Sequence, residues 1–239
     1  MSPPVISFVL PTYKEKENLA NLIPEIEEAF ESISHEIIVV DDNSQDGTRE
    51  LIERLNGRYA NITLVERPGL LGLGGALRDG YNKARGEYIL SSDADSFRVK
   101  DMRSLYEKIL EGWDLVLGYK VYVSAEVRAQ TFKEWCKTYV FSEFSNAIIR
   151  ILAGIRLKNY NTNFRIIRTS TWRKVRTKEV RHFFLFETIL RAKRTGARIT
   201  ELPVEFHSRT FGESKVSFFK QAPAYFLKLL WYTIFDRSS

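Results

Sequence analysis

The chain has 239 residues, of which 44% are hydrophobic and 28% are charged. This length suits one large α/β domain or two small ones, and this composition excludes a disordered chain. The net charge of +6 favours anionic partners, namely phosphates, nucleic acid or acidic lipid head groups, without choosing among them.

Short apolar runs alternate with amphipathic segments over the first half of the chain. Apolar runs bounded by turn residues are typical of buried strands, and apolar residues three and four apart indicate helices. We expect strands at residues 5–10, 36–40, 62–65, 87–90 and 115–117, with helices at 17–32, after residue 48, within 72–84 and at 101–110. This alternation predicts parallel strands joined by right-handed crossovers.

The pattern changes after about residue 120. We expect one long helix or two consecutive helices over 126–152, strands at 164–167 and 198–201, a helix at 183–194, and an aromatic helical tail at 216–235. The sequence contains no repeat, low-complexity tract or linker, so the prediction is a single domain over residues 1–239.

Acidic residues follow two of the predicted strands directly. Asp41 and Asp42 end the run at 36–40, and Asp93-Ala94-Asp95 follows the run at 87–90 after two serines. Ligands of open α/β sheets bind beyond the carboxyl ends of the strands, and in extended backbone residues two apart face the same side. Because Mg²⁺ and Mn²⁺ prefer oxygen ligands, Asp93 and Asp95 are predicted to hold a divalent cation.

The segment that begins at Asp42 has two interpretations. Its carboxylate can accept hydrogen bonds from the N–H groups of a base or from ribose hydroxyls. A turn with a helix N-cap supplied by Asn43, Ser44 or Asp46 also explains the segment in part. The turn does not explain why two adjacent acids end an apolar strand.

Two further segments are candidates for binding an anion. The glycines between Gly69 and Gly75 permit close backbone approach to a phosphate, and a purely structural loop is the alternative. Their spacing is not that of a P-loop, nor do they follow the first strand as a dinucleotide fingerprint would. The segment from Arg209 to Lys215 has a glycine between basic residues, as in a loop that closes on an anion or an exposed basic loop.

Several features of the chain narrow the classes of partner and compartment. Cys136 is the only cysteine, so no internal disulfide is possible and a reducing compartment is expected. We expect no secretory signal, and no window approaches the roughly 20 apolar residues that span a bilayer. Basic residues are dispersed, without a finger, zipper or RNA-binding aromatic motif, so no nucleic-acid partner is expected.

Taken together and in this order, the motifs resemble those of family 2 glycosyltransferases, and within them the dolichol-phosphate mannose synthase branch. The residues that carry the resemblance are Pro11 to Leu19, Val39 to Thr48, Gly72 to Ala76 with Gly80, Asp93 to Asp95, Phe164-Arg165 and Arg209 to Lys215. The resemblance implies a GT-A type α/β fold, with a Rossmann-like, mostly parallel sheet flanked by helices. It also implies a nucleotide-sugar donor and a divalent cation, Mg²⁺ or Mn²⁺.

The resemblance further implies roles for individual residues. Asp93 and Asp95 would bind the metal and the diphosphate, and would be catalytic together with Arg209 and Lys215. The residues expected at the donor are Pro11, Tyr13, Glu15, Val40, Asp42, Asp93, Asp95 and Lys120. Those expected at the acceptor phosphate are Lys137, Ser142, Arg209, Ser214 and Lys215. Residues 1–120 would form the nucleotide-sugar-binding half, 121–215 the acceptor-side half, and 216–239 a membrane-interface helix.

The chain departs from the family pattern at several positions. Lys14 stands where Asn is usual, Phe97 where Gln often follows the metal acids, and Lys120 where Arg is common. The segment that usually reads Asp-Pro-Thr-Ser-Gly-Phe-Arg is Asn159 to Arg165 here. The change at Phe97 affects a third metal contact that the family usually has, and the change at 159–165 affects the acceptor side.

The expected reaction is displacement at the anomeric carbon with inversion. A hydroxyl acceptor needs a general base, whereas a polyprenyl phosphate is already ionised. Cations are frequent after the metal motif and Glu187 is the one candidate base, which favours transfer to dolichyl or polyprenyl phosphate, with GDP-mannose as the first choice of donor. UDP-glucose as donor, a glycan hydroxyl as acceptor, and a non-catalytic nucleotide-sugar-binding subunit remain alternatives.

The aromatic and basic tail bears on the location of the protein. Such a composition suits an amphipathic helix in a membrane interface, and a core helix or a partner-binding face is the alternative. We therefore expect a cytoplasmic protein that is peripherally associated with the cytoplasmic face of a membrane, through the membrane surface or a membrane-anchored partner.

Overall fold

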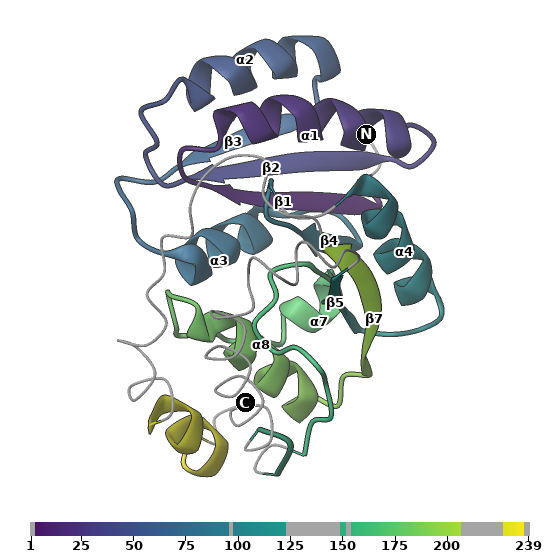
Figure 1. Cartoon of the computed structure of the whole chain (residues 1–239), viewed down its shortest axis with the longest axis vertical. Coiled ribbons are helices and arrows are strands. Elements are labelled where there is room, and N and C mark those ends of the chain that lie inside the picture. Colours follow the sequence, from purple (N-terminus) through teal and green to yellow (C-terminus); the bar gives the residue numbers. More distant parts are fainter. Residues whose placement is uncertain (1–2, 96–97, 123–148, 152–153, 207–226, 237–239) are drawn as a thin grey trace.

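The computed structural model describes residues 3–95, 98–122, 149–151, 154–206 and 227–236 (Figure 1). Within these residues the chain forms one sheet of seven strands, in the order β3-β2-β1-β4-β6-β5-β7, with helices on both faces. No helix in the described part of the chain is long and apolar enough to cross a membrane.

The four strands of the amino-terminal half are parallel. They are β1 (Ile6–Thr12), β2 (His35–Asp41), β3 (Ile62–Glu66) and β4 (Tyr88–Ser91). Strand β1 pairs with β2 on one side and β4 on the other, and β2 pairs with β3. All residues of β1 and β4 are buried, which explains their nearly continuous apolar sequences.

The remaining strands extend the sheet beyond β4. They are β5 (Leu115–Tyr122), β6 (Arg165–Arg168) and β7 (Ile199–Phe206). Strand β6 is antiparallel to both β4 and β5, and β7 is parallel to β5. Six of the seven strands therefore point the same way, and their carboxyl ends share one edge of the sheet.

Helices cover the two faces of the sheet with two separate apolar clusters. Helices α1 (Lys16–Ala29), α2 (Thr48–Tyr59) and α4 (Val99–Leu110) pack on the face formed by residues such as Phe8 and Val39. Helices α3 (Leu73–Lys83) and α8 (Phe183–Arg194) pack on the face formed by Val9 and Val40. Because alternate residues of a strand face opposite sides, each buried strand contributes to both clusters.

Two shorter helical segments complete the described chain. Helix α7 (Thr169–Trp172) follows β6 directly, and residues 227–234 form a helix near the carboxyl terminus. Leu229 and Tyr232 of this last helix are buried in the same cluster as α8. The alternative interpretation of the tail as a core helix is therefore correct for one side of this helix.

The structure confirms the predicted fold class, a mostly parallel sheet flanked by helices. Each predicted strand and each predicted helix before residue 120 is present, with bounds that differ by a few residues. The helices expected at 126–152 and the first part of the tail lie almost entirely outside the described residues. The division into donor and acceptor halves stays a prediction.

Candidate active site

The loops after β1, β2 and β4 meet at the carboxyl edge of the sheet. Thr12 pairs with Asp41 at the ends of β1 and β2, and the amide of Asp42 donates to the carbonyl oxygen of Thr12 at 3.1 Å. The amide of Ser92, just past β4, donates to the carbonyl of Val9 at 3.3 Å. The sheet alone therefore brings the acids at 41–42 and 93–95 to one edge.

Asp41 organises the loop that follows β2. Its carboxylate accepts hydrogen bonds from the amide of Ser44, at 3.0 Å, and from the Ser44 hydroxyl. The Ser44 Oγ in turn accepts a hydrogen bond from the amide of Lys14 at 2.8 Å, which ties the loop after β2 to the loop after β1. Lys14, Asn43 and Gln45 all have positive φ, between 54° and 63°, a conformation that is uncommon outside glycine.

Asp46 binds the first residue of α2, although the N-cap position itself is Gly47 and not one of the three residues expected there. Its Oδ1 accepts from the amide and hydroxyl of Thr48, at 3.1 and 2.6 Å, at the start of α2. Burial raises the pKa of Asp46, but the hydrogen bonds from Thr48 and from the amide of Lys16 outweigh it, and the net pKa is lowered. Asp41 and Asp46 are therefore engaged within the loop, and the role of Asp42 at the nucleoside stays a prediction.

Asp42 is buried and paired with Arg67, a residue that the sequence analysis missed. One Asp42 oxygen accepts from Arg67 Nη1 and the other from the amide of Gly72, at 3.2 Å. Arg67 Nη1 also donates to the carbonyl of Gly72 at 3.2 Å, and its Nε lies 3.0 Å from Asp79 Oδ2. The one sequence signal that could have identified Arg67 is its position directly after the strand at 62–66.

The glycine loop has structural roles in this arrangement. A Cβ on Gly75 would collide with the Arg67 guanidinium, and a Cβ on Gly74 would collide with the start of α8. Gly72 has a φ of 98°, and the Gly75 amide donates to the carbonyl of Val180 at 2.9 Å. The loop thus packs Arg67 and α8 together beside Asp42, in agreement with the structural reading.

Asp93 and Asp95 lie just beyond β4 and are both partly exposed. Ala94 and Asp95 are in a turn, so the expectation of an extended Asp93-Ala94-Asp95 segment was wrong. Asp93 Oδ1 accepts from Asn163 Nδ2 at 3.1 Å, and Asn163 is almost completely buried just before β6. Within the described residues no three His, Cys, Asp or Glu side chains are grouped closely enough to hold a metal ion.

His182, which precedes α8 and is partly buried, and Arg165 of β6 are two basic residues behind the Asp93 segment. Burial lowers the pKa of His182, and the negative charge of Asp93 opposes this shift only in part, so the imidazole is neutral near pH 7. Arg165 is fully buried, and burial lowers its pKa to about 10. Its guanidinium donates to the carbonyls of Thr162, at 2.9 Å, and Leu185, at 3.0 Å, which holds the segment around Asn163 against α8.

Glu187, the candidate general base, is a structural residue. It is fully buried and accepts hydrogen bonds from the amides of Lys178 and Glu179, at 2.9 Å each, and from Arg191 Nε at 2.8 Å. With both oxygens engaged in the core, its carboxylate cannot reach a hydroxyl acceptor. Glu187 therefore does not fit the general base that a hydroxyl acceptor would need.

The other predicted donor residues occupy the same edge or the core beneath it. Pro11 is the buried penultimate residue of β1, and Tyr13 and Glu15 follow in the loop, partly exposed. Val40 is fully buried and packs in the core toward α3, so only its main chain can face a donor. Lys120 pairs with Val204 in the β5–β7 ladder.

Five predicted residues of the acceptor side lie outside the described residues. They are Lys137, Ser142, Arg209, Ser214 and Lys215. Phe97, which replaces the usual glutamine, is also outside them. Their roles stay predictions from the resemblance.

Comparison with known protein families identifies the chain. The model of the family described as Glycosyl transferase family 2 matches residues 7–181. The chain belongs to this family. The matched range contains the loops after β1, β2 and β4, and the family predicted from the motifs is confirmed.

Curated relatives agree with the branch that the motifs resemble. The dolichol-phosphate mannosyltransferase of Pyrococcus furiosus is 29% identical over 214 residues, which are 88% of this chain and 59% of the relative. The polyprenol monophosphomannose synthase of Mycolicibacterium smegmatis is 29% identical over 87% of this chain and 80% of its own. A dolichyl-phosphate beta-glucosyltransferase of Trichomonas vaginalis is 25% identical over 89% and 68%. The chain thus spans about three fifths of the Pyrococcus relative.

A solved structure supports the fold. Glucosyl-3-phosphoglycerate synthase from Mycobacterium tuberculosis, in complex with Mn²⁺, UDP and phosphoglyceric acid, superposes with a TM-score of 0.69 at 16% identity. The match covers 95% of this chain and 78% of that protein. This likeness confirms the GT-A type fold expected from the sequence.

Proposed function

We propose that this family 2 glycosyltransferase transfers a hexose, with mannose from GDP-mannose as first choice, to a dolichyl or polyprenyl phosphate with inversion at the anomeric carbon. The main observation behind the proposal is that the Asp42–Arg67 pair and the carboxylates of Asp93 and Asp95 lie at the same edge of the sheet. The names of the Pyrococcus and Mycolicibacterium relatives support the class of acceptor.

The residues present fit a divalent cation whose coordination shell is completed by the donor diphosphate. Asp93 and Asp95 are partly exposed carboxylates, and Asn163 orients the former at 3.1 Å. With no third protein ligand grouped near them among the described residues, phosphate oxygens and water would supply the rest of the coordination shell. When bound, Mg²⁺ or Mn²⁺ would stabilise the charge that develops on the leaving diphosphate.

The nucleoside would lie beside the Asp42–Arg67 pair. Asp42 already accepts from Arg67 and the Gly72 amide, so a base N–H would share an occupied carboxylate. This pair fixes the direction of the carboxylate, and it does not by itself choose guanine over uracil. The partly exposed Tyr13 provides a ring on which a base or ribose could stack.

The burial of Glu187 favours a phosphate acceptor over a glycan hydroxyl. A hydroxyl must lose its proton to a base, whereas a phosphate monoester is ionised and needs only to be positioned by cations. The candidate cations are Lys120, Lys137, Arg209 and Lys215, with Ser142 and Ser214 as further phosphate contacts.

The carboxyl-terminal helix supports docking at a membrane surface. Leu227, Trp231, Ile234 and Phe235 have exposed side chains, with exposed fractions between 45% and 71%. The spacing of Leu227, Trp231 and Ile234 places them on one side of the helix, opposite the buried Leu229, and Phe235 follows the helix directly. We propose peripheral association with the cytoplasmic face of a membrane, where the chain of a polyprenyl phosphate would remain in the bilayer.

The test is transfer from labelled GDP-mannose and UDP-glucose to polyprenyl phosphate, with Mg²⁺, with Mn²⁺ and with EDTA. Asp95→Asn should abolish transfer, while Glu53→Gln, on the exposed surface of α2, should leave it unchanged. Donor binding without any transfer would refute the catalytic proposal. Transfer only from UDP-glucose would favour the second candidate, a glucosyltransferase, to which the Trichomonas relative points.

A further inference from the structure

Two adjacent leucines are exposed in the loop between β3 and α3. Leu70 and Leu71 have exposed fractions of 64% and 50%. The loop is fixed on Asp42 at both ends, because Arg67 pairs with this carboxylate and the amide of Gly72 donates to it at 3.2 Å. A single exposed leucine needs no explanation, but a contiguous apolar patch marks an interaction site, so the neighbours of the pair decide what it means.

The neighbour of this loop is the segment before α8. Gly72, which follows the two leucines, lies against this segment, because a Cβ on Gly72 would be 2.8 Å from the carbonyl oxygen of Val180. The amide of Gly75 donates to the same carbonyl at 2.9 Å. Val180 is itself exposed, with an exposed fraction of 45%. The leucines of the loop and Val180 therefore belong to adjoining parts of the surface.

The segment before α8 also contacts the carboxyl-terminal helix. Glu179 accepts hydrogen bonds from Lys228 Nζ at 2.5 Å and from the Tyr232 hydroxyl at 3.1 Å. Figure 1 shows the loop before α3, the segment before α8 and the yellow carboxyl-terminal helix one after another along the same side of the molecule. The exposed apolar residues of these three segments, here called the apolar strip, are Leu70, Leu71, Val180, Leu227 and Trp231.

Basic residues accompany the apolar strip. Arg176, Lys178 and Arg181 are all exposed in the segment before α8. The acid among them, Glu179, is already paired with Lys228. In the part of the chain that the structure describes, Arg176 and Arg181 have no acidic partner. An apolar strip with unpaired cations beside it is complementary to a bilayer, which is apolar inside and can be anionic at its surface.

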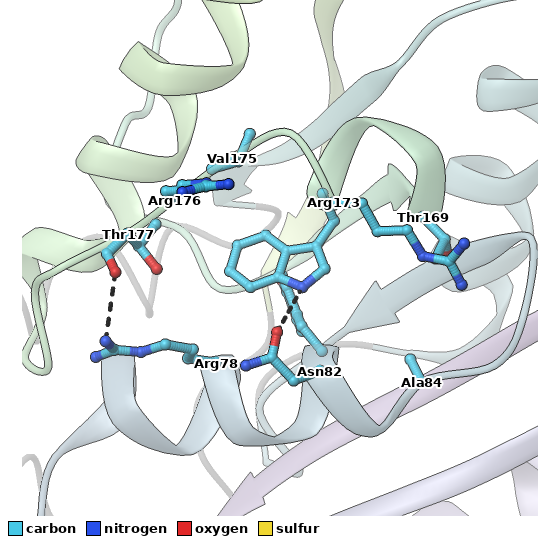
Figure 2. Close-up of a pocket in the computed structure, with 10 residues that line it drawn as sticks. Arg78, Asn82, Ala84, Thr169, Arg173, Val175, Arg176 and Thr177 are labelled. Atoms are coloured by element: carbon cyan, nitrogen blue, oxygen red, sulfur yellow. Dashed lines mark hydrogen bonds between the residues drawn. The ribbon is translucent and has the colours of Figure 1, made fainter. Parts of the chain in front are cut away.

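The basic segment is anchored on α3 by hydrogen bonds. Arg78 donates to the carbonyl of Glu179 at 2.8 Å and to the carbonyl of Thr177 at 3.4 Å, and Figure 2 shows Arg78 reaching from α3 to Thr177. Trp172 Nε1 donates to Asn82 Oδ1 at 3.1 Å further along the same helix. The backbone that carries the cations is therefore placed by the fold, and a preformed surface loses little conformational entropy when it docks.

From the exposed leucine pair, the apolar strip and the unpaired cations, we propose that the loop from Pro68 to Leu71 is a second membrane-docking element. It enters the head-group region of an anionic bilayer beside the carboxyl-terminal helix. This inference rests on the membrane association proposed above and adds the contact that orients the protein. Because the loop lies between Arg67 and Gly72, its docking brings the Asp42–Arg67 pair to the level of the head groups, where the phosphate of a lipid acceptor lies.

The first experiment places a fluorescent probe on the loop. Cys136 is the only cysteine, so Leu70→Cys in a Cys136→Ser background takes a single nitrobenzoxadiazole label, whose emission depends on the polarity around it. With phosphatidylcholine vesicles that contain phosphatidylserine, this emission should rise and shift to shorter wavelength. The same label on Leu110→Cys, an exposed position at the far end of α4, should not respond.

The second experiment measures sedimentation of the whole chain with vesicles, with and without phosphatidylserine. Leu70→Ser/Leu71→Ser should weaken binding at least about tenfold, because two apolar side chains no longer leave water. Arg176→Gln/Arg181→Gln should weaken binding about tenfold at low ionic strength, and only where the vesicles are anionic. The matched control Leu110→Ser, which removes an equally exposed leucine, should bind like wild type.

The outcomes separate this proposal from the function proposed above. If wild type binds vesicles while the label at position 70 and Leu70→Ser/Leu71→Ser show no effect, the loop proposal is overturned and the carboxyl-terminal helix keeps its proposed role. If wild type binds no vesicles, both membrane proposals are overturned, whereas transfer to polyprenyl phosphate in detergent still tests the transferase. An equal response of the label at position 110 would also overturn the loop proposal.

Discussion

Replacing Arg67 by methionine tests whether the buried ion pair organises the nucleoside side of the site. The side chains of Arg67 and Asp42 are only 7% and 5% exposed, so the variant leaves a buried carboxylate with the Gly72 amide as its one remaining partner. Removal of one partner from a buried pair costs about 3–5 kcal/mol. For a domain of this size 3 kcal/mol lowers the Tm by roughly 6–12 °C.

The assay is urea unfolding of wild type, Arg67→Met, Asp42→Asn and the double variant Arg67→Met/Asp42→Asn. Asp42→Asn removes the charge and keeps one acceptor oxygen, so either Arg67 Nη1 or the Gly72 amide loses its acceptor. Arg67 still faces Asp79, so the cost should be smaller than that of Arg67→Met. In the double variant the uncompensated charge is gone, and the cycle should give a coupling free energy of at least about 1 kcal/mol. Binding of nucleoside diphosphate, measured at a temperature where every variant is folded, should weaken together with the pair.

A loss below about 1 kcal/mol in Arg67→Met would refute this reasoning, because a buried carboxylate without its partner cannot be that cheap. Additive effects in the double variant would also refute it. Arg67→Lys provides the matched control. It keeps the charge but cannot bridge Asp42, the Gly72 carbonyl and Asp79 at once, so it should fall between wild type and Arg67→Met.

Three further predictions follow from the structure. Glu187→Gln should lower the free energy of unfolding in urea by about 2–4 kcal/mol, because Glu187 holds Arg191 and two backbone amides. The kcat of the folded variant should stay within about threefold of wild type. Loss of turnover in the folded variant would instead support Glu187 as a base. Gly80→Ala should cost about 1–3 kcal/mol, because a Cβ there collides with Val9 and lies 3.1 Å from Val40 Cγ2; an unchanged Tm would contradict this packing. Burial lowers the pKa of His35, but Glu27 and the Ile33 carbonyl raise it more, so the net pKa is raised. The free energy of unfolding therefore contains a contribution from protonated His35 that is complete below about pH 6.5 and is lost as pH rises through the folded pKa. His35→Asn should remove this part of the pH dependence of the free energy of unfolding.

The local pattern of the sequence was sufficient for the elements and for the acids at strand ends. Apolar runs such as 37–40 are strands because they are covered on both faces, and the residues after them necessarily reach the carboxyl edge. The motif at Asp93 was recognisable because it depends on three adjacent residues. The conformation of this motif was not, since Asp-Ala-Asp is compatible with both extended backbone and the turn found at Ala94–Asp95.

The partners of these acids could not be predicted, because they come from distant segments. Asp42 is paired with Arg67, and Asp93 with Asn163, which follows it by 70 residues. The sequence also could not show that Glu187 points into the core, since a helix that is buried nearly all round presents no polar face by which to orient it. The surface beside the glycine loop likewise joins segments that are distant in the sequence, because Gly72 lies against Val180.

The sequence by itself determined the alternation of strands and helices, the family, and the two acidic segments that end buried strands. These depend on burial periodicity and on short motifs, which are local. Tertiary packing alone decided which acids are locked into the fold and which face the site, because a buried carboxylate is stable only where distant donors converge on it. The same packing left Asp93 and Asp95 partly exposed at the edge of the sheet, where a cation and a diphosphate can reach them.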